Sequence, residues 1–109
     1  MRRGDHLQGA LELVILKTLA AGPNHGFGIT THIQTVSTGL LRVEEGSLYP
    51  ALHRLIKRGW ISVEEGTSEN NRRAKFYKLT AKGRRQLELE TSKWDKLARA
   101  ITRILQPAE

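Results

Sequence analysis

The chain of 109 residues is the size of one domain, and a hydrophobic content of 39% is that of a globular protein. Its 18 Lys and Arg against 11 Asp and Glu give a formal net charge of +7, which indicates a polyanionic partner: DNA, RNA or an anionic membrane. The absence of cysteine excludes disulfides and thiolate metal ligands, and no run approaches the roughly 18 apolar residues that span a bilayer.

Residues 7–21 read as a helix that ends at Gly22-Pro23. Apolar residues run nearly all the way round it, interrupted mainly by Glu12 and Lys17. A helix that is apolar on every side is buried on every side, and one small domain can hardly cover it. We therefore expect a second subunit to cover this helix.

A weaker second helix is expected over residues 24–37, with Asn24 or His25 as its cap. Gly26 and Gly28 near its start indicate either the close approach of another backbone or a loose first turn. Its apolar stripe consists of Ile29, Ile33 and Val36.

The third helix has the clearest boundaries. Ser47 is a candidate N-cap, Pro50 falls in the first turn, where its missing N–H is harmless, and Gly59 lies just past the end. One face is apolar and carries Leu48, Leu52, Leu55 and Ile56. The opposite face carries Tyr49, His53 and Lys57 at every fourth position, with Pro50 and Arg54 beside them.

After the third helix the pattern changes from helical to alternating. Residues 60–65 and 76–80 predict two strands of a hairpin. The inward-facing residues are expected to be Ile61, Val63, Tyr77 and Leu79. The polar turn between the strands carries Arg72, Arg73 and Lys75 at or near its tip.

A long last helix is predicted from Thr80 to about Leu105. Its apolar residues recur at heptad spacing: Leu87, Trp94 and Ile101, and again Leu97 and Ile104. Such a seam is a packing surface for another helix.

Three helices, a hairpin and a further helix, with a basic hairpin after the best-defined helix, are the order of a winged helix-turn-helix. The fold class expected is therefore mainly α with a small β-hairpin. Residues 1–83 are predicted to form the DNA-binding domain, and residues 84–109 a C-terminal dimerisation helix in the same globule.

Three blocks of this sequence resemble the PadR family of transcriptional regulators: His25–Ile29 (HGFGI), Gly46–Leu55 (GSLYPALHRL) and Arg73–Gly83 (RAKFYKLTAKG). The resemblance implies a cytoplasmic, homodimeric, usually repressive DNA-binding protein of the compact subgroup with a short C-terminal helix. It also implies a palindromic operator, dimerisation through the first and last helices, and often control by a small ligand. Phe27 and Phe76 stand where the family frequently has Tyr, so position 27 has no hydroxyl for a phosphate.

We expect contacts with double-stranded DNA from the third helix and the wing, against the alternative that both are ordinary solvated surfaces. The candidates are Ser47, Tyr49, Pro50, His53, Arg54 and Lys57 on the helix, and Asn71, Arg72, Arg73 and Lys75 on the wing. Ser47 either donates to a phosphate or only caps the helix. Tyr77 and Trp60 are expected in the core.

The expected dimer interface draws on both terminal helices: Leu11, Val14, Ile15, Leu87, Trp94, Leu97, Ile101 and Ile104. Symmetry would bring two copies of Trp94 near one axis. Trp94 and Leu97 then either pack only, or line a site for a small aromatic or hydrophobic effector.

The sequence gives little support for an enzymatic function, since it has no Gly-rich phosphate loop and no nucleophile motif. The four histidines lack metal-ligand spacing with carboxylates, and we expect no metal, no cofactor and no membrane association. The alternative function is a winged-helix module that binds RNA or another protein without reading a DNA sequence.

Overall fold

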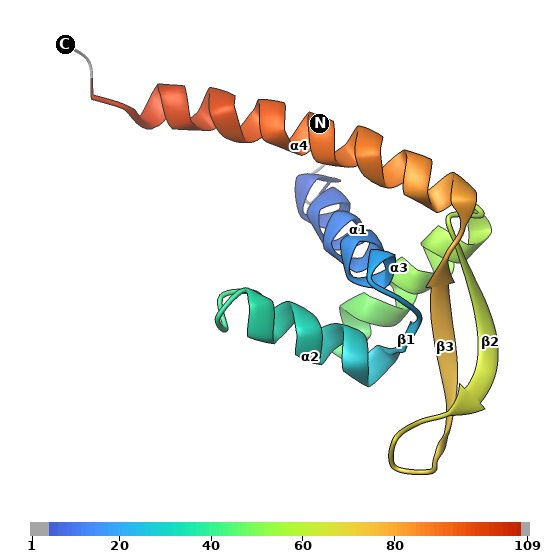
Figure 1. Ribbon diagram of the computed structural model, residues 1–109. Helices are drawn as coiled ribbons and strands as arrows, with labels where there is room; N and C mark the ends of the chain where they lie inside the picture. Colours follow the sequence, from blue (N-terminus) through green and yellow to red (C-terminus); the bar gives the residue numbers. More distant parts are fainter. Residues whose placement is uncertain (1–4, 108–109) are drawn as a thin grey trace.

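A computed structural model describes residues 5–107 (Figure 1). Its elements in chain order are α1 (Asp5–Ala20), β1 (Asn24–His25), α2 (Gly26–Val36), α3 (Glu45–Lys57), β2 (Ile61–Thr67), β3 (Arg73–Leu79) and α4 (Ala81–Leu105). The three strands form one antiparallel sheet in the order β1-β3-β2. The predicted fold class, a winged helix with flanking helices, is confirmed. Among the described residues, no helix is both long and apolar enough to cross a membrane.

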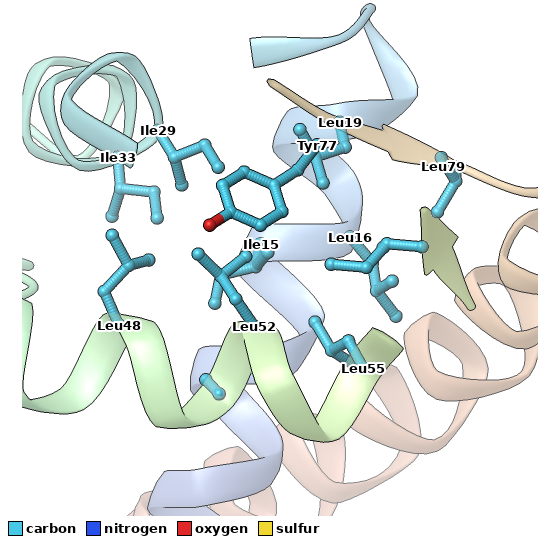
Figure 2. Packing of buried hydrophobic residues seen from close by; sticks show 12 residues of the cluster. Ile15, Leu16, Leu19, Ile29, Ile33, Leu48, Leu52, Leu55, Tyr77 and Leu79 are labelled. Atoms are coloured by element: carbon cyan, nitrogen blue, oxygen red, sulfur yellow. The ribbon is translucent and has the colours of Figure 1, made fainter. Parts of the chain in front are cut away.

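The core lies where α1, α2 and α3 meet the base of the sheet (Figure 2). Its fully or nearly fully buried side chains are Ile15, Leu16, Leu19, Ile29, Ile33, Leu48, Ala51, Leu52, Leu55, Ile61, Tyr77 and Leu79. Figure 2 shows the ring of Tyr77 among the aliphatic side chains of the three helices. Tyr77 and Leu79 therefore point inward as predicted. Val63 is 40% exposed although it pairs with Tyr77, because β2 is an edge strand of the sheet and β3 is the central one.

The strand β1 consists of Asn24 and His25, which lie at the start of the predicted second helix, residues 24–37. They instead pair with β3, where Asn24 lies opposite Tyr77 and His25 opposite Phe76. His25 then caps α2, as its Nδ1 accepts a hydrogen bond from the N–H of Gly28 at 3.0 Å. The apolar stripe predicted for α2 is buried at Ile29 and Ile33 only, since Val36 in the last turn is 68% exposed.

The start of α3 differs from the predicted one. Glu44 has the extended backbone of an N-cap, and the N–H of Ser47 already donates to the carbonyl of Glu44 at 3.0 Å. Ser47 is therefore a residue of the first turn, and the prediction that it caps the helix is wrong. At the other end Gly59 has a φ of +78°, the left-handed conformation expected there.

The start of α4 is fixed against the end of α3. The hydroxyl of Thr80 donates to the carbonyl of Gly59 at 2.7 Å and accepts from the N–H of Gly83 at 3.0 Å. Gly83 is buried, and a side chain there would collide with the carbonyl of Trp60. From this anchor α4 crosses α1 and extends well beyond the rest of the fold, which gives the molecule its longest extent of 59 Å (Figure 1).

Candidate nucleic-acid interface

The helix α3 presents three different sides to its surroundings. Its apolar side, with Leu48, Leu52 and Leu55 at 0–1% exposure, is closed by the core. The side directly opposite carries the exposed residues Pro50, His53 and Lys57. These three form a solvent-facing row that no other element covers in the described structure.

Tyr49 lies between the core and this row, on the flank of α3 that faces α2. A Cβ added to Gly26 would lie 2.6 Å from the hydroxyl oxygen of Tyr49. A side chain at position 26 would therefore displace Tyr49. Of the two interpretations of Gly26, close approach and a loose turn, the structure supports close approach, by a side chain and not by a backbone. Tyr49 remains 39% exposed, so part of its ring is open beside the solvent-facing row.

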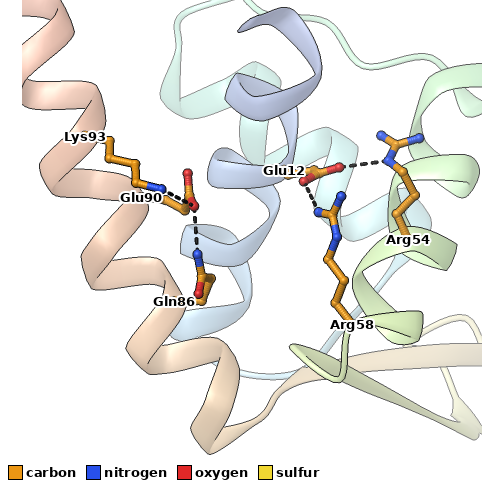
Figure 3. Close-up of polar contacts among 6 residues, drawn as sticks. All are labelled: Glu12, Arg54, Arg58, Gln86, Glu90 and Lys93. Carbon is orange, nitrogen blue, oxygen red and sulfur yellow. Dashed lines mark hydrogen bonds and ion pairs between the residues drawn. The ribbon is translucent and has the colours of Figure 1, made fainter. Parts of the chain in front are cut away.

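Arg54 lies on the other flank of α3, which faces α1, together with Arg58 one turn later (Figure 3). The Nε of Arg54 donates to one carboxylate oxygen of Glu12 at 2.8 Å, and Nη1 of Arg58 donates to the other at 2.6 Å. The guanidinium of Arg58 also lies 5.0 Å from the ring centre of Trp60. Arg54 is thus turned toward α1 and away from the solvent-facing row in which sequence placed it.

The wing is formed by β2, β3 and the turn between them. The turn closes through the N–H of Ser68 to the carbonyl of Arg72 at 2.8 Å, and Asn71 takes a left-handed φ of +58°. Asn tolerates this conformation better than most residues, which explains its place in the turn. Both strands are longer than predicted, so Arg73 and Lys75 belong to β3 while Arg72 belongs to the turn.

The basic residues of the wing differ in their surroundings, although all of them are exposed. In the register of the hairpin Lys75 lies opposite Glu65, whereas Arg73 lies opposite Thr67. Side chains directly opposite each other share one face of the sheet. The carboxylate of Glu65 therefore offsets part of the charge of Lys75, whereas a neutral residue lies opposite Arg73.

One tyrosine titrates away from its ordinary range. Burial raises the pKa of Tyr77, and the neighbouring charge of an ionised Tyr49 would raise it further. The phenol of Tyr77 is therefore held neutral, as expected of a core residue.

Among the described residues, no group of three His, Asp or Glu side chains is arranged to hold a metal ion.

Six of the eight predicted dimer residues fall into two groups. Leu11, Val14 and Leu87 are partly buried against the core of their own chain. Trp94, Ile101 and Ile104 are 45%, 46% and 80% exposed along α4. Ile15 belongs to neither group, because it is 0% exposed inside its own subunit, and its prediction as an interface residue is wrong.

Trp94 and Leu97 line an open groove of about 370 Å³ between α1 and α4. Its walls include Leu13 from α1 and the charged residues Glu90 and Lys93 from α4. Lys93 lies 3.6 Å from Glu90, and Glu90 also accepts a hydrogen bond from Gln86 at 2.7 Å (Figure 3). The groove therefore combines an aromatic wall with a polar rim.

Glu12 and Arg58 are the residues of this region that sequence reasoning missed. A signal was present, since Glu12 interrupts an otherwise apolar helix. A carboxylate in such a position is buried only when it is paired. The spacing of four between Arg54 and Arg58 matches one carboxylate that serves two guanidinium groups.

Comparison with known proteins places this chain in a family. The transcriptional regulator PadR-like family matches residues 15–89. The chain is 34% identical over 94 residues to the transcriptional regulator Rv3488 of Mycobacterium tuberculosis, which covers 86% of this chain and 84% of that protein.

Solved structures agree with this match. A transcriptional regulator from Clostridium thermocellum superposes with a TM-score of 0.84 at 25% identity and covers 97% of this chain and 100% of its own. A PadR-like transcriptional regulator from Bacillus cereus gives a TM-score of 0.79 at 29% identity, with 94% and 97% covered. The predicted resemblance is confirmed: the chain belongs to the PadR-like family of transcriptional regulators, which are not enzymes.

Proposed function

We propose that this protein is a homodimeric repressor that binds an inverted-repeat operator in double-stranded DNA, and that a small ligand at the subunit interface relieves binding. The observation that carries the proposal is the solvent-facing row of α3 next to a basic wing, in a chain of a transcriptional regulator family. The wing extends away from the helices (Figure 1), and the residues of the row are exposed.

The helix and the wing have different tasks in this proposal. The solvent-facing row of α3, with Tyr49 and Ser47 beside it, enters the major groove and supplies sequence choice, while Lys57 in the last turn of α3 contacts phosphate. Arg72, Arg73, Lys75 and Asn71 meet the phosphate backbone or the minor groove and supply most of the affinity. Arg54 is left out of the contact set, because Glu12 already binds its guanidinium.

The exposed apolar residues of α4 support the dimer. Trp94, Ile101 and Ile104 would lie in water in a single subunit, and contiguous apolar exposure of this kind marks an interaction surface. A two-fold partner that packs on α1 and α4 covers them and fixes the distance between two copies of α3. For successive major grooves on one face of DNA, this distance is about 34 Å.

The groove beside Trp94 supports the ligand step. A small aromatic or hydrophobic molecule fits an aromatic wall of this kind, and Leu97 adds apolar contact. Such a molecule lowers operator affinity only if it binds the non-DNA-binding arrangement of the subunits more tightly than the other.

The test is selection of bound duplex fragments from genomic DNA with the purified protein at near-physiological salt. We expect an enriched inverted repeat, lost in Tyr49→Ala and weakened evenly across sequences in Arg73→Ala. Salt-sensitive binding without an enriched sequence would contradict sequence-specific recognition. It would favour the alternative, a module for RNA or protein partners.

A further inference from the structure

We infer that Glu12 is a positioning residue for DNA recognition: it holds Arg54 and Arg58 against α1 and thereby keeps two guanidinium groups of α3 off the DNA phosphates. The inference rests on the proposed function, because it concerns which cations of the recognition helix meet DNA. It assigns a role to an acidic residue on α1, outside the DNA-facing elements.

The geometry of the cluster supports this role. Both carboxylate oxygens of Glu12 are occupied, one by each arginine, at 2.8 and 2.6 Å. The side chain of Glu12 is only 11% exposed, so water competes weakly for it. Charge-assisted bonds of this length are the strong kind, and they fix the direction of both guanidinium groups.

The arginines are held in place but are not sealed off from solvent. The side chains of Arg54 and Arg58 are 30% and 44% exposed, and each guanidinium has more donors than the one that Glu12 uses. A hollow of about 240 Å³ lined by Glu12, Arg58 and Trp60 lies beside the cluster and leaves room for rotation. Loss of the carboxylate therefore frees two long cationic side chains next to Lys57.

Free arginines at this position would raise affinity for any DNA, because phosphates carry no sequence information. They would strengthen binding to wrong sequences about as much as binding to the operator. By holding them back, Glu12 keeps sequence-independent binding to every duplex weaker, and the ratio between operator and random-sequence affinity is left to the base contacts of α3.

The experiment measures how the affinity for a random-sequence duplex depends on salt. Each phosphate contact steepens the slope of log K against log salt by about 0.9. For Glu12→Gln we expect a slope that is steeper by about 0.9 to 1.8 and tighter binding to the random duplex. Glu88→Gln, an equal change of net charge at an exposed position of α4, should leave the slope unchanged and serves as the matched control.

A second arm decides the question even if Glu12→Gln does not fold. Arg58→Gln in the otherwise unchanged protein should keep the original slope, since its guanidinium does not meet phosphate. Lys57→Gln, the same loss of charge one residue earlier in the solvent-facing row, should flatten the slope by about 0.9. Circular dichroism shows that each variant is folded at the temperature used.

The outcomes separate this inference from the proposed function. A flatter slope in Arg58→Gln, or an unchanged slope in folded Glu12→Gln, would overturn the role of Glu12 while leaving DNA binding intact. A purely structural ion pair would lower the thermal stability of Glu12→Gln without changing its slope, and that also overturns the inference. If the unaltered protein binds no duplex at any salt concentration, the proposed function fails and the inference fails with it.

Discussion

The helices α3 and α4 are both amphipathic, but their apolar residues differ in exposure: those of α3 are buried, and many of those of α4 are exposed. In α3, Leu48, Leu52 and Leu55 are at most 1% exposed, and the polar side is left open. In α4, Gly83 is the buried residue, and Ile104 remains 80% exposed. The difference arises because α3 lies across the core, whereas the second half of α4 extends past it (Figure 1). A subunit therefore completes the packing of α3 by itself, whereas the second half of α4 is left open, and the proposed dimer would cover it.

The largest expected effect is on the buried side of α3. Leu52→Ala should lower the free energy of unfolding by about 2–5 kcal/mol, because it opens a cavity at a fully buried position. Urea denaturation measures it, and the loss should be the same at all protein concentrations. The matched truncation Ile104→Ala on α4 should instead give a loss that depends on protein concentration, as expected for a residue buried only by a partner. Equal, concentration-independent losses would remove the contrast between the two helices.

The second largest expected effect is on the dissociation constant of the proposed dimer. Changing Ile101 and Ile104 together to Glu should weaken dimerisation by about 100-fold, or about 3 kcal/mol, because two apolar contacts are replaced by charges. Sedimentation equilibrium measures the dissociation constant, and circular dichroism should show an unchanged helical content. A variant that keeps the dimer would contradict the assignment of α4 as an interface.

A smaller effect is expected on the open side of α3. Lys57→Ala should weaken binding to all duplexes by less than about tenfold and flatten the salt slope by about 1. The dimer should be unchanged, because Lys57 faces solvent and lies apart from α4. Fluorescence anisotropy with labelled DNA at several salt concentrations gives both quantities. A loss confined to one DNA sequence would instead assign Lys57 to base reading.

The smallest effect is a pH dependence from Tyr77, which packs in the core with α3. Since the folded protein holds its pKa above the ordinary value of about 10, the stabilisation is present below that pH. It is lost as the pH rises through about 10 toward the higher pKa of the folded state. Urea denaturation of the protein and of Tyr77→Phe at pH 8 and above pH 10 should show the steeper decline in the unaltered protein. Parallel declines would contradict the raised pKa.

Much of the fold followed from local sequence patterns. The glycine after α3 and the two strands of the hairpin are set by neighbouring residues, and the structure has them, although Val63 is exposed. Of the two caps considered for α2, Asn24 and His25, the structure has His25. The exposure of His53 and Lys57 on one side of α3 was also predicted, because a spacing of four places residues on one side of a helix wherever that helix lies.

The errors share a physical cause. The pairing of β1 with β3 joins Asn24 to Tyr77, and two residues are too short for any periodicity to reveal a strand. Ile15 was assigned to the interface because α1 is apolar all round, and the sequence does not say which apolar residues the subunit covers itself. The ion pair between Arg54 and Glu12 was not foreseen, because the two residues lie 42 positions apart.

The sequence by itself determined the order of the elements, the apolar and polar sides of α3, and the basic wing, because these depend on residues within a few positions of one another. Only the tertiary structure decided which cations remain free to meet DNA and which apolar residues remain for a partner. Those outcomes depend on how α1 packs against α3 and on how far α4 reaches past the core. Contacts between distant segments fix both, and no local pattern encodes them.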